Sequence, residues 1–145
     1  MDISTKHDNA RLAAGRIPAL NASLTLLEVA DPVVAHIEFY SAPRPAPGAT
    51  PTGDLVVSVN VAATAGHVDT DLFQVHLTVP IEGQITGADA EDGSTVTWAR
   101  IIDGEGDWFA DVSVSDEAGS GEIKLQTTLL YNGAYCRLTS VILQG

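Results

Sequence analysis

After residue 32, apolar and polar residues alternate with a period of two over most of the chain. This alternation is typical of strands that bury one face, and Gly- and Asp-rich turns separate the runs. It predicts an all-β fold, an antiparallel β-sandwich or jelly roll over residues 33–145. We predict seven or eight strands, at 33–41, 54–62, 72–80, 81–85 (the weakest), 94–102, 107–115, 122–130 and 136–144.

The same alternation predicts which side chains share one face of a strand. One such face holds Leu55, Val57, Val59 and Val61. Another holds Trp108, Ala110, Val112 and Val114. The segment 42–53 contains four prolines and two glycines, and it is predicted to be a loop because proline cannot donate to a sheet ladder.

The N-terminal segment has a helical pattern. Its stretch 8–20 is predicted to form a short helix capped by Asp8 or Asn9. Pro18 is expected to end or kink this helix, because proline removes a helical hydrogen bond. The predicted organisation is a single domain, with a helix or arm over 1–32 and the β-sandwich over 33–145.

The formal net charge of −12 is unevenly distributed. Residues 1–53 carry four basic and five acidic residues, whereas residues 54–145 carry three basic and fourteen acidic ones. So acidic a surface repels phosphate groups, and we expect neither a nucleic-acid nor a membrane partner. The N-terminus has no apolar signal core, and no apolar run approaches the ~20 residues of a membrane span. The single cysteine, Cys136, rules out an internal disulfide and suits a reducing cytosol.

The motif DGEGD at 103–107 is the strongest candidate for chemistry. Its carboxylates Asp103, Glu105 and Asp107 are the candidate metal ligands. An EF-hand loop counted from Asp103 requires glycine at position 6 and glutamate at position 12, where Trp108 and Val114 stand. A different calcium site, shared with Asp89, Glu91 and Asp92 of the turn at 87–93, stays open.

DGEGD has two further interpretations. A glycosidase acid–base pair needs a cleft with opposed carboxylates, which the pattern does not indicate. A hairpin tip explains more, because strand patterns end on either side of it. In that interpretation Gly104 and Gly106 supply positive φ angles, and Asp103 and Asp107 hydrogen-bond locally. We therefore predict a turn, with no metal and no catalytic residue.

The remaining candidate residues also favour structural roles. The histidines at 7, 36, 67 and 76 share no short ligand spacing, and His36 and His76 are expected to face solvent. Cys136 is expected to be a buried, inert thiol. Trp98 and Trp108 flank one predicted hairpin and are interpreted as core or interface anchors, with a sugar-stacking platform as the alternative. We predict no cofactor and no enzymatic activity.

Several motifs occur in a familiar order: ARLAAGRIPAL, IEFYS, a PRPAP...PTG loop, STVTWARIIDGEGDWFADVSVS, GEIKLQTTLL and RLTSVILQG. This order resembles that of small structural proteins encoded by tailed bacteriophages and prophages. The resemblance covers most of the chain and carries no catalytic residue. The chain departs from that group in its acidity after residue 54 and in the passage NASLTLLEVADP, which is expected to be extended.

The resemblance implies a virion structural protein, most concretely a head decoration or cement protein that stabilises the capsid shell. Its expected location is the virion, after assembly in the host bacterial cytoplasm. The expected partners are the major capsid protein or other virion proteins, together with further copies in a dimer or trimer. The alternatives are a tail, collar or fibre-associated protein, and a carbohydrate-binding adhesion module.

The expected partner surface lies in the least acidic parts of the chain, 1–32 and 42–53. A stable interface usually buries at least ~1,000 Å² and uses aromatic and arginine anchors. The predicted interface residues are Arg11, Arg16, Arg44, Pro45, Pro47, Trp98 and Trp108.

Overall fold

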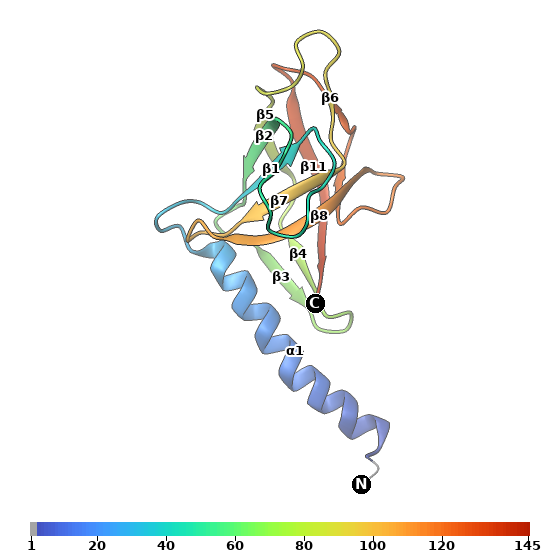
Figure 1. Cartoon of the computed structure of the whole chain (residues 1–145). Coiled ribbons are helices and arrows are strands. Elements are labelled where there is room, and N and C mark those ends of the chain that lie inside the picture. Colours follow the sequence, from blue (N-terminus) through green and yellow to red (C-terminus); the bar gives the residue numbers. More distant parts are fainter. Residues whose placement is uncertain (1–2) are drawn as a thin grey trace.

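The computed structural model describes residues 3–145, which form one long helix and a curled β-sheet (Figure 1). Helix α1 (Thr5–Glu28) projects from the sheet, with its N-terminal end farthest away (Figure 1). The strands are β1 (His36–Tyr40), β2 (Leu55–Asn60), β3 (Gly66–Asp69), β4 (Gln74–Leu77), β5 (Ile81–Gln84), β6 (Ser94–Thr95), β7 (Trp98–Ile102), β8 (Trp108–Asp116), β9 (Ile123–Leu125), β10 (Leu129–Leu130) and β11 (Tyr135–Gln144).

Within these residues, eight strands follow one another in the order β2-β1-β7-β8-β9-β11-β4-β3. Strand β5 pairs with β11 beside this path, and β10 pairs with β6 separately. The sheet curls far enough to bring the end of β5 back to β2, where the Gly87 N–H donates to the Val56 carbonyl at 3.0 Å. The curl encloses one apolar core, which includes Ile37, Phe39, Ile85, Ile101, Ile123, Leu125 and Leu138.

The sheet is mixed, whereas the sequence pattern predicted antiparallel pairing throughout. Strands β8 and β9 run parallel, with Val114 opposite Ile123. The chain first turns back after β8, where Asp116 Oδ1 accepts hydrogen bonds from the Ala118 and Gly119 N–H groups. It then reverses a second time before β9, so β9 runs beside β8 in the same direction. The observed architecture is therefore a curled, mostly β fold.

Two β-bulges overturn the predicted faces. Phe39 pairs with Val57 and Tyr40 with Leu55, so Val56 is the extra residue and is buried while Leu55 is 42% exposed. On β8, Trp108 pairs with Ile102, and the extra residue is Phe109. A bulge adds one residue to a strand and so shifts the alternation by one. Trp108 therefore lies on the opposite face from Ala110, Val112 and Val114.

The predicted strand boundaries were wrong at three places. The run at 72–80 is strand only over β4, because Phe73 has a positive φ of 54° and belongs to the turn between β3 and β4. The runs at 94–102 and 122–130 each divide into two strands. Strand β3 was missed because it is only four residues long, too short for a periodic signal.

Helix α1 is longer than the predicted 8–20. It starts after the N-cap Ser4 and runs through Pro18 to Glu28, so residues 21–28 are helical and not extended. Pro18 is exposed, which allows water to satisfy the carbonyl that loses its helical partner. The last turns bury Leu24 and Leu27 against the sheet, and this packing stabilises the helix beyond the proline.

Candidate functional site

The DGEGD segment is the tip of the β7–β8 hairpin, as the pattern predicted. Asp103 Oδ1 accepts hydrogen bonds of 2.9 Å from the Glu105 and Asp107 N–H groups. The Asp103 N–H donates to the Asp107 carbonyl at 3.0 Å. Asp103 is only 5% exposed, so it is a buried turn acceptor and not a loop-tip carboxylate in water.

The same tip holds the C-terminal end of helix α1. The Gly104 N–H donates to the Leu26 carbonyl at 3.0 Å, and the Val33 N–H donates to the Gly104 carbonyl at 3.3 Å. A Cβ on Gly104 would lie 1.4 Å from the Val29 carbonyl oxygen. Gly104 is therefore required for close packing, whereas Gly106, with a φ of 88°, has the positive φ that was predicted for both glycines.

One aspartate in each acidic turn accepts hydrogen bonds from the backbone of that turn. Asp89 Oδ1 accepts hydrogen bonds of 2.9 Å from the Glu91 and Asp92 N–H groups, which hold the pKa of Asp89 below its usual range. Among residues 3–145, no group of three or more His, Cys, Asp and Glu side chains is arranged to hold a metal ion. Asp89 and Asp103 therefore act as local hydrogen-bond acceptors in their turns.

A buried polar cluster joins the β7–β8 hairpin to the Pro-rich loop. Arg100 and Asp111 form a paired salt bridge, with Nε–Oδ1 at 2.7 Å and Nη2–Oδ2 at 2.9 Å. Their side chains are 9% and 0% exposed. Arg100 Nη2 also donates to the Ala49 carbonyl at 2.8 Å, and Asp111 Oδ2 accepts from the Gly48 N–H at 3.0 Å. We call this cluster of Arg100, Asp111, Gly48 and Ala49 the clamp.

The charges of the clamp are stabilised by this geometry. Burial raises the pKa of Asp111, but hydrogen bonds from Arg100, Gly48 and Trp108 outweigh it and hold that pKa below its usual range. The hydrogen bond with Asp111 raises the pKa of Arg100. The ion pair therefore stays charged at neutral pH while it fixes an otherwise irregular loop.

The two tryptophans lie on the same face of the sheet as Arg100 and Asp111, and we call it the clamp face. Their environments differ. Trp98 is buried, stacks on Tyr40 with ring centroids 5.1 Å apart, and donates from Nε1 to the Ala42 carbonyl at 2.6 Å. Burial and a hydrogen bond with Glu38 raise the pKa of Tyr40 to about 12. Trp108 is 47% exposed, and its Nε1 donates to Asp111 Oδ1 at 3.2 Å.

Trp108 packs its indole ring against Gly48 of the Pro-rich loop, where a Cβ would lie 3.4 Å from the ring. The loop thus brings Arg44, Pro45 and Pro47 to the same face as both tryptophans, with Arg44 and Pro47 exposed. Of the seven predicted interface residues, Arg44, Pro45, Pro47 and Trp108 therefore lie on this face, whereas Trp98 is buried and is not available to a partner. Arg11 and Arg16 lie apart from them on helix α1.

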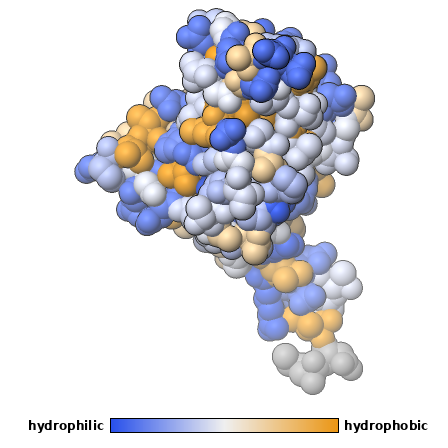
Figure 2. Space-filling view, turned by 45° about the horizontal axis from the view of Figure 1, so that its top comes forward, coloured by the Kyte–Doolittle hydropathy of each residue, from blue (hydrophilic) through white to orange (hydrophobic). Residues whose placement is uncertain are grey.

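Helix α1 divides into an anchored half and a free half. In the anchored half, Arg16 Nη2 donates to the Gly145 carbonyl at 2.8 Å, and its guanidinium lies 4.9 Å from the centroid of the Phe73 ring. In the free half, residues 3–12 are all exposed, and Leu12 is 48% exposed. Figure 2 shows apolar and hydrophilic residues side by side on the projecting helix.

The charge of the free half is opposite to that of the rest. Residues 3–15 carry two basic side chains and one acidic, a net +1, whereas residues 16–145 carry five basic and seventeen acidic, a net −12. We call residues 3–15 the arm. The arm is the part of the chain best suited to approach an anionic protein surface without repulsion.

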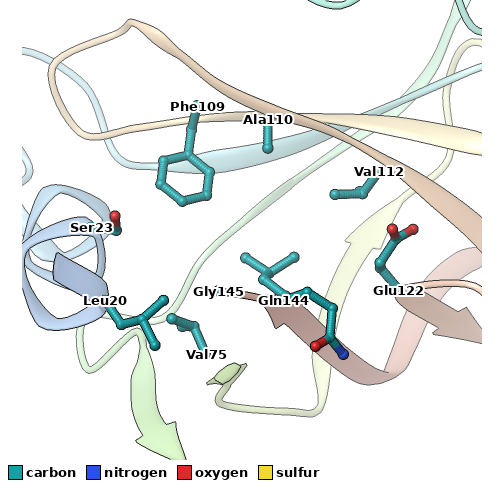
Figure 3. A pocket seen from close by; sticks show the side chains of 10 residues that line it. Leu20, Ser23, Val75, Phe109, Ala110, Val112, Glu122, Gln144 and Gly145 are labelled. Carbon is teal, nitrogen blue, oxygen red and sulfur yellow. The ribbon is translucent and has the colours of Figure 1, made fainter. Parts of the chain in front are cut away.

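An open pocket of about 450 Å³ lies between helix α1 and the sheet. In Figure 3 the side chains of Leu20, Val75, Phe109 and Val112 point into it, and Glu122 lies at its edge. Glu122 is the one acidic residue that lines this pocket in the described chain, and its carboxylate accepts hydrogen bonds from the Ser113 N–H and hydroxyl. The pocket is therefore an apolar hollow whose carboxylate is already bonded.

No family model matches this sequence, and no curated protein or solved structure matches it either. None of the helices formed by residues 3–145 has the length and apolar character needed to span a membrane. The residues themselves must therefore carry any functional argument.

The other predicted site residues have local structural roles. His36 is half-buried, and its Nδ1 lies 2.9 Å from the Val34 carbonyl. Cys136 is buried as predicted, and burial raises the pKa of its thiol to about 12. His76 is half-buried beside His67, a neighbour that sequence spacing did not indicate.

The clamp was missed from the sequence, although a weak signal for it exists. Arg100 and Asp111 are opposite charges on the two sides of the predicted DGEGD turn. Counting outward from Glu105 pairs residue 100 with residue 110, and only the bulge at Phe109 brings Arg100 opposite Asp111. The ion pair is therefore visible only once the bulge is known.

Proposed function

We propose that this protein is a structural component of a tailed-bacteriophage virion, and specifically a head decoration protein that binds and stabilises the capsid shell. The order of sequence motifs supports this class. The observation that carries the proposal is the arm, an exposed, basic and partly apolar half-helix attached to a strongly acidic β body.

The arm suits attachment better than catalysis or small-ligand binding. A helix of 24 residues is about 36 Å long, and its N-terminal end projects beyond the sheet (Figure 1), whereas Leu12 lines an open hollow with Phe73 of the β3–β4 turn. Burial of exposed apolar residues such as Leu12 by a partner lowers the free energy of the complex. The positive charges of Lys6 and Arg11 attract an acidic surface. The rest of the chain, with its net −12, would discourage attachment in the wrong orientation.

The clamp face supports the proposal in a second way. Its Pro-rich loop is fixed by the buried ion pair, so Arg44, Pro47 and Trp108 are displayed on a rigid surface. A preorganised surface loses less conformational entropy on binding. We therefore assign the arm as the primary attachment element and the clamp face as a second contact, with a neighbouring capsid subunit or another copy of the chain.

The experiment is to locate the protein in particles. Virions of the encoding phage are purified, separated into heads and tails, and analysed by quantitative mass spectrometry. We expect the chain in the head fraction at a fixed ratio to the major capsid protein. Its presence only in tails would overturn the decoration role in favour of a tail or collar protein, and its absence from particles would overturn a virion role altogether.

A carbohydrate-binding adhesion module is the second candidate, favoured by one observation. Trp108 is half-exposed beside the acidic hairpin tip, and exposed aromatic rings stack on sugars. A glycan array tests it with the wild-type chain and Trp108→Ala. Binding that disappears in the variant would support this candidate, and an array without hits would remove it.

A further inference from the structure

Two histidines face each other across the β3–β4 hairpin, next to the anchored half of helix α1. His67 and His76 are paired in register, and their ring centroids lie 5.2 Å apart with the planes tilted by 33°. Two imidazoles bound to one tetrahedral ion, at metal–nitrogen distances of about 2.0–2.1 Å, have ring centroids about 5 Å apart. The strand pairing thus already holds both rings at a separation suited to chelation.

The hydrogen bonding of His76 leaves one ring nitrogen available. Its Nε2 lies 3.1 Å from Gln74 Oε1, and an amide oxygen only accepts hydrogen bonds. Nε2 therefore carries the proton, and Nδ1 presents a lone pair. Histidines that bind metals commonly donate their second ring N–H to an oxygen in this way.

The surroundings of the histidines favour a cation. Asp69 and Gln74 form the next pair on the same face of the hairpin. Asp69 Oδ1 accepts hydrogen bonds of 2.9 Å from the Asp71 and Leu72 N–H groups, which hold this carboxylate at the end of the hairpin. A carboxylate beside two imidazoles lowers the cost of placing a positive ion between them.

The site also has room for an ion with bound water. An open hollow of about 360 Å³ is lined by His67, His76 and the hydroxyl-bearing residues Thr78, Thr139 and Ser140. The Thr78 and Thr139 hydroxyls donate to the Thr64 and Lys124 carbonyls, so their oxygens can still accept hydrogen bonds from water molecules that complete the coordination of an ion.

We propose that His67 and His76 bind one divalent transition-metal ion of the zinc, nickel or copper class, with His76 coordinating through Nδ1. Imidazole nitrogen is a preferred ligand of these ions, whereas calcium and magnesium require oxygen. With two protein ligands, the site binds more weakly than a four-ligand structural zinc site. Each histidine must present an unprotonated ring nitrogen, so protons compete with the ion for the site.

The ion would stabilise the base of the arm. It would join β3 to β4, and the turn between these strands carries Phe73, which contacts Arg16 of helix α1. The Phe73 carbonyl also accepts a 2.9 Å hydrogen bond from the Gly145 N–H. Metal that binds only the folded hairpin raises the melting temperature progressively as its concentration increases. This inference is independent of any virion role.

The test uses the untagged full chain and isothermal titration calorimetry with NiCl₂ and, separately, ZnCl₂. We expect one ion per chain, and at least a tenfold loss of affinity in His67→Ala and in His76→Ala. His36→Ala is the matched control, since it removes a strand histidine from another part of the sheet and leaves affinity unchanged. His67 is exposed, so its variant is expected to fold even if the His76 variant does not.

The proposal is overturned if the wild-type chain shows no binding, if it binds half an ion per chain, or if His67→Ala titrates like wild type. NMR of the imidazole nitrogens adds a second reading. We expect zinc to shift Nδ1 of His76 while Nε2 keeps its proton, and coordination through Nε2 would contradict the assigned geometry.

Discussion

The Pro-rich loop and helix α1 were both predicted to contact a partner, yet the structure holds them in opposite ways. The loop has irregular backbone, but the clamp binds both Gly48 and Ala49 to a buried ion pair. The helix has regular backbone, but residues 3–12 are all exposed. Regular secondary structure is thus a poor guide to which segment is fixed. Buried polar contacts immobilise the loop. The described residues of the arm make no such contact, so the N-terminal half of helix α1 is available to a partner.

The largest expected effect comes from breaking the clamp. Asp111→Ala leaves Arg100 buried without its carboxylate, and we expect a loss of about 3–5 kcal/mol of unfolding free energy. Urea denaturation measures it. The matched control is Arg137→Ala, which breaks an exposed pair with Glu82 at 3.5 Å and should cost less than ~1 kcal/mol. Equal costs for the two variants would show that the clamp does not fix the loop.

The next effect concerns the contact between the hairpin tip and the helix. Gly104→Ala would place a methyl group 1.4 Å from the Val29 carbonyl oxygen, so the end of the helix must move. We expect a loss of about 2–4 kcal/mol from overpacking and from the weakened hydrogen bond to Leu26. Thermal unfolding of the purified variant measures this loss.

Gly15→Ala is the control for this variant. Gly15 lies in helix α1, where an added methyl group would have no neighbouring atom within 4 Å, so alanine should stabilise the chain by about 0.5–1 kcal/mol. Gly104→Ala and Gly15→Ala should thus shift the melting temperature in opposite directions. A neutral Gly104→Ala would mean that the tip does not anchor the helix.

A smaller effect is expected from acid. The carboxyl of Asp111 titrates near ~3.9 in the unfolded chain and lower in the folded protein, so the folded state binds fewer protons in this range. The stability from the clamp is therefore complete above about pH 5 and is lost as the pH falls through the lower folded value. Urea midpoints compared between neutral pH and about pH 3 should fall in wild type and fall less in Asp111→Asn. A wild-type midpoint that stays constant across this range would contradict the expectation.

A substitution in the arm should change stability the least and attachment to capsids the most. Leu12→Asp changes an exposed residue of the arm, so the unfolding free energy should change by less than ~0.5 kcal/mol. Because the change puts a charge into the proposed contact, we expect binding to capsids to weaken at least tenfold. Leu129→Asp is the control, since Leu129 is 39% exposed on β10 and away from the arm. Sedimentation of capsids with labelled chain distinguishes the two variants.

The sequence predicted the β-rich class and most of the longer strands, because one-sided burial produces a period of two. It did not reveal the faces of Leu55 and Trp108, because a single extra residue at Val56 or Phe109 reverses the alternation. The parallel β8–β9 pair was also hidden, since a short Gly-rich turn is equally typical of a simple hairpin. Local periodicity contains no information on such long-range pairings.

The candidate surface was predicted in part. The basic residues of the arm and the Pro-rich loop stand out by charge and composition, and the structure gathers Arg44, Pro47 and Trp108 on one face. The extension of the helix through Pro18 was not predictable from propensity, because tertiary packing of Leu24 and Leu27 outweighs the proline. The role of Gly104 depends on a contact with Val29, far earlier in the chain, so a hairpin motif alone could not reveal it.

Reconstitution of the protein with capsids tests whether the arm attaches it to the capsid. Capsids from a phage that lacks the gene are mixed with purified wild-type chain or with a chain that lacks residues 1–15, and bound copies per capsid are counted by cryo-EM. We predict saturating occupancy for wild type and none for the truncated chain, whose β body should remain folded by circular dichroism. Equal occupancy by the two chains would contradict the account.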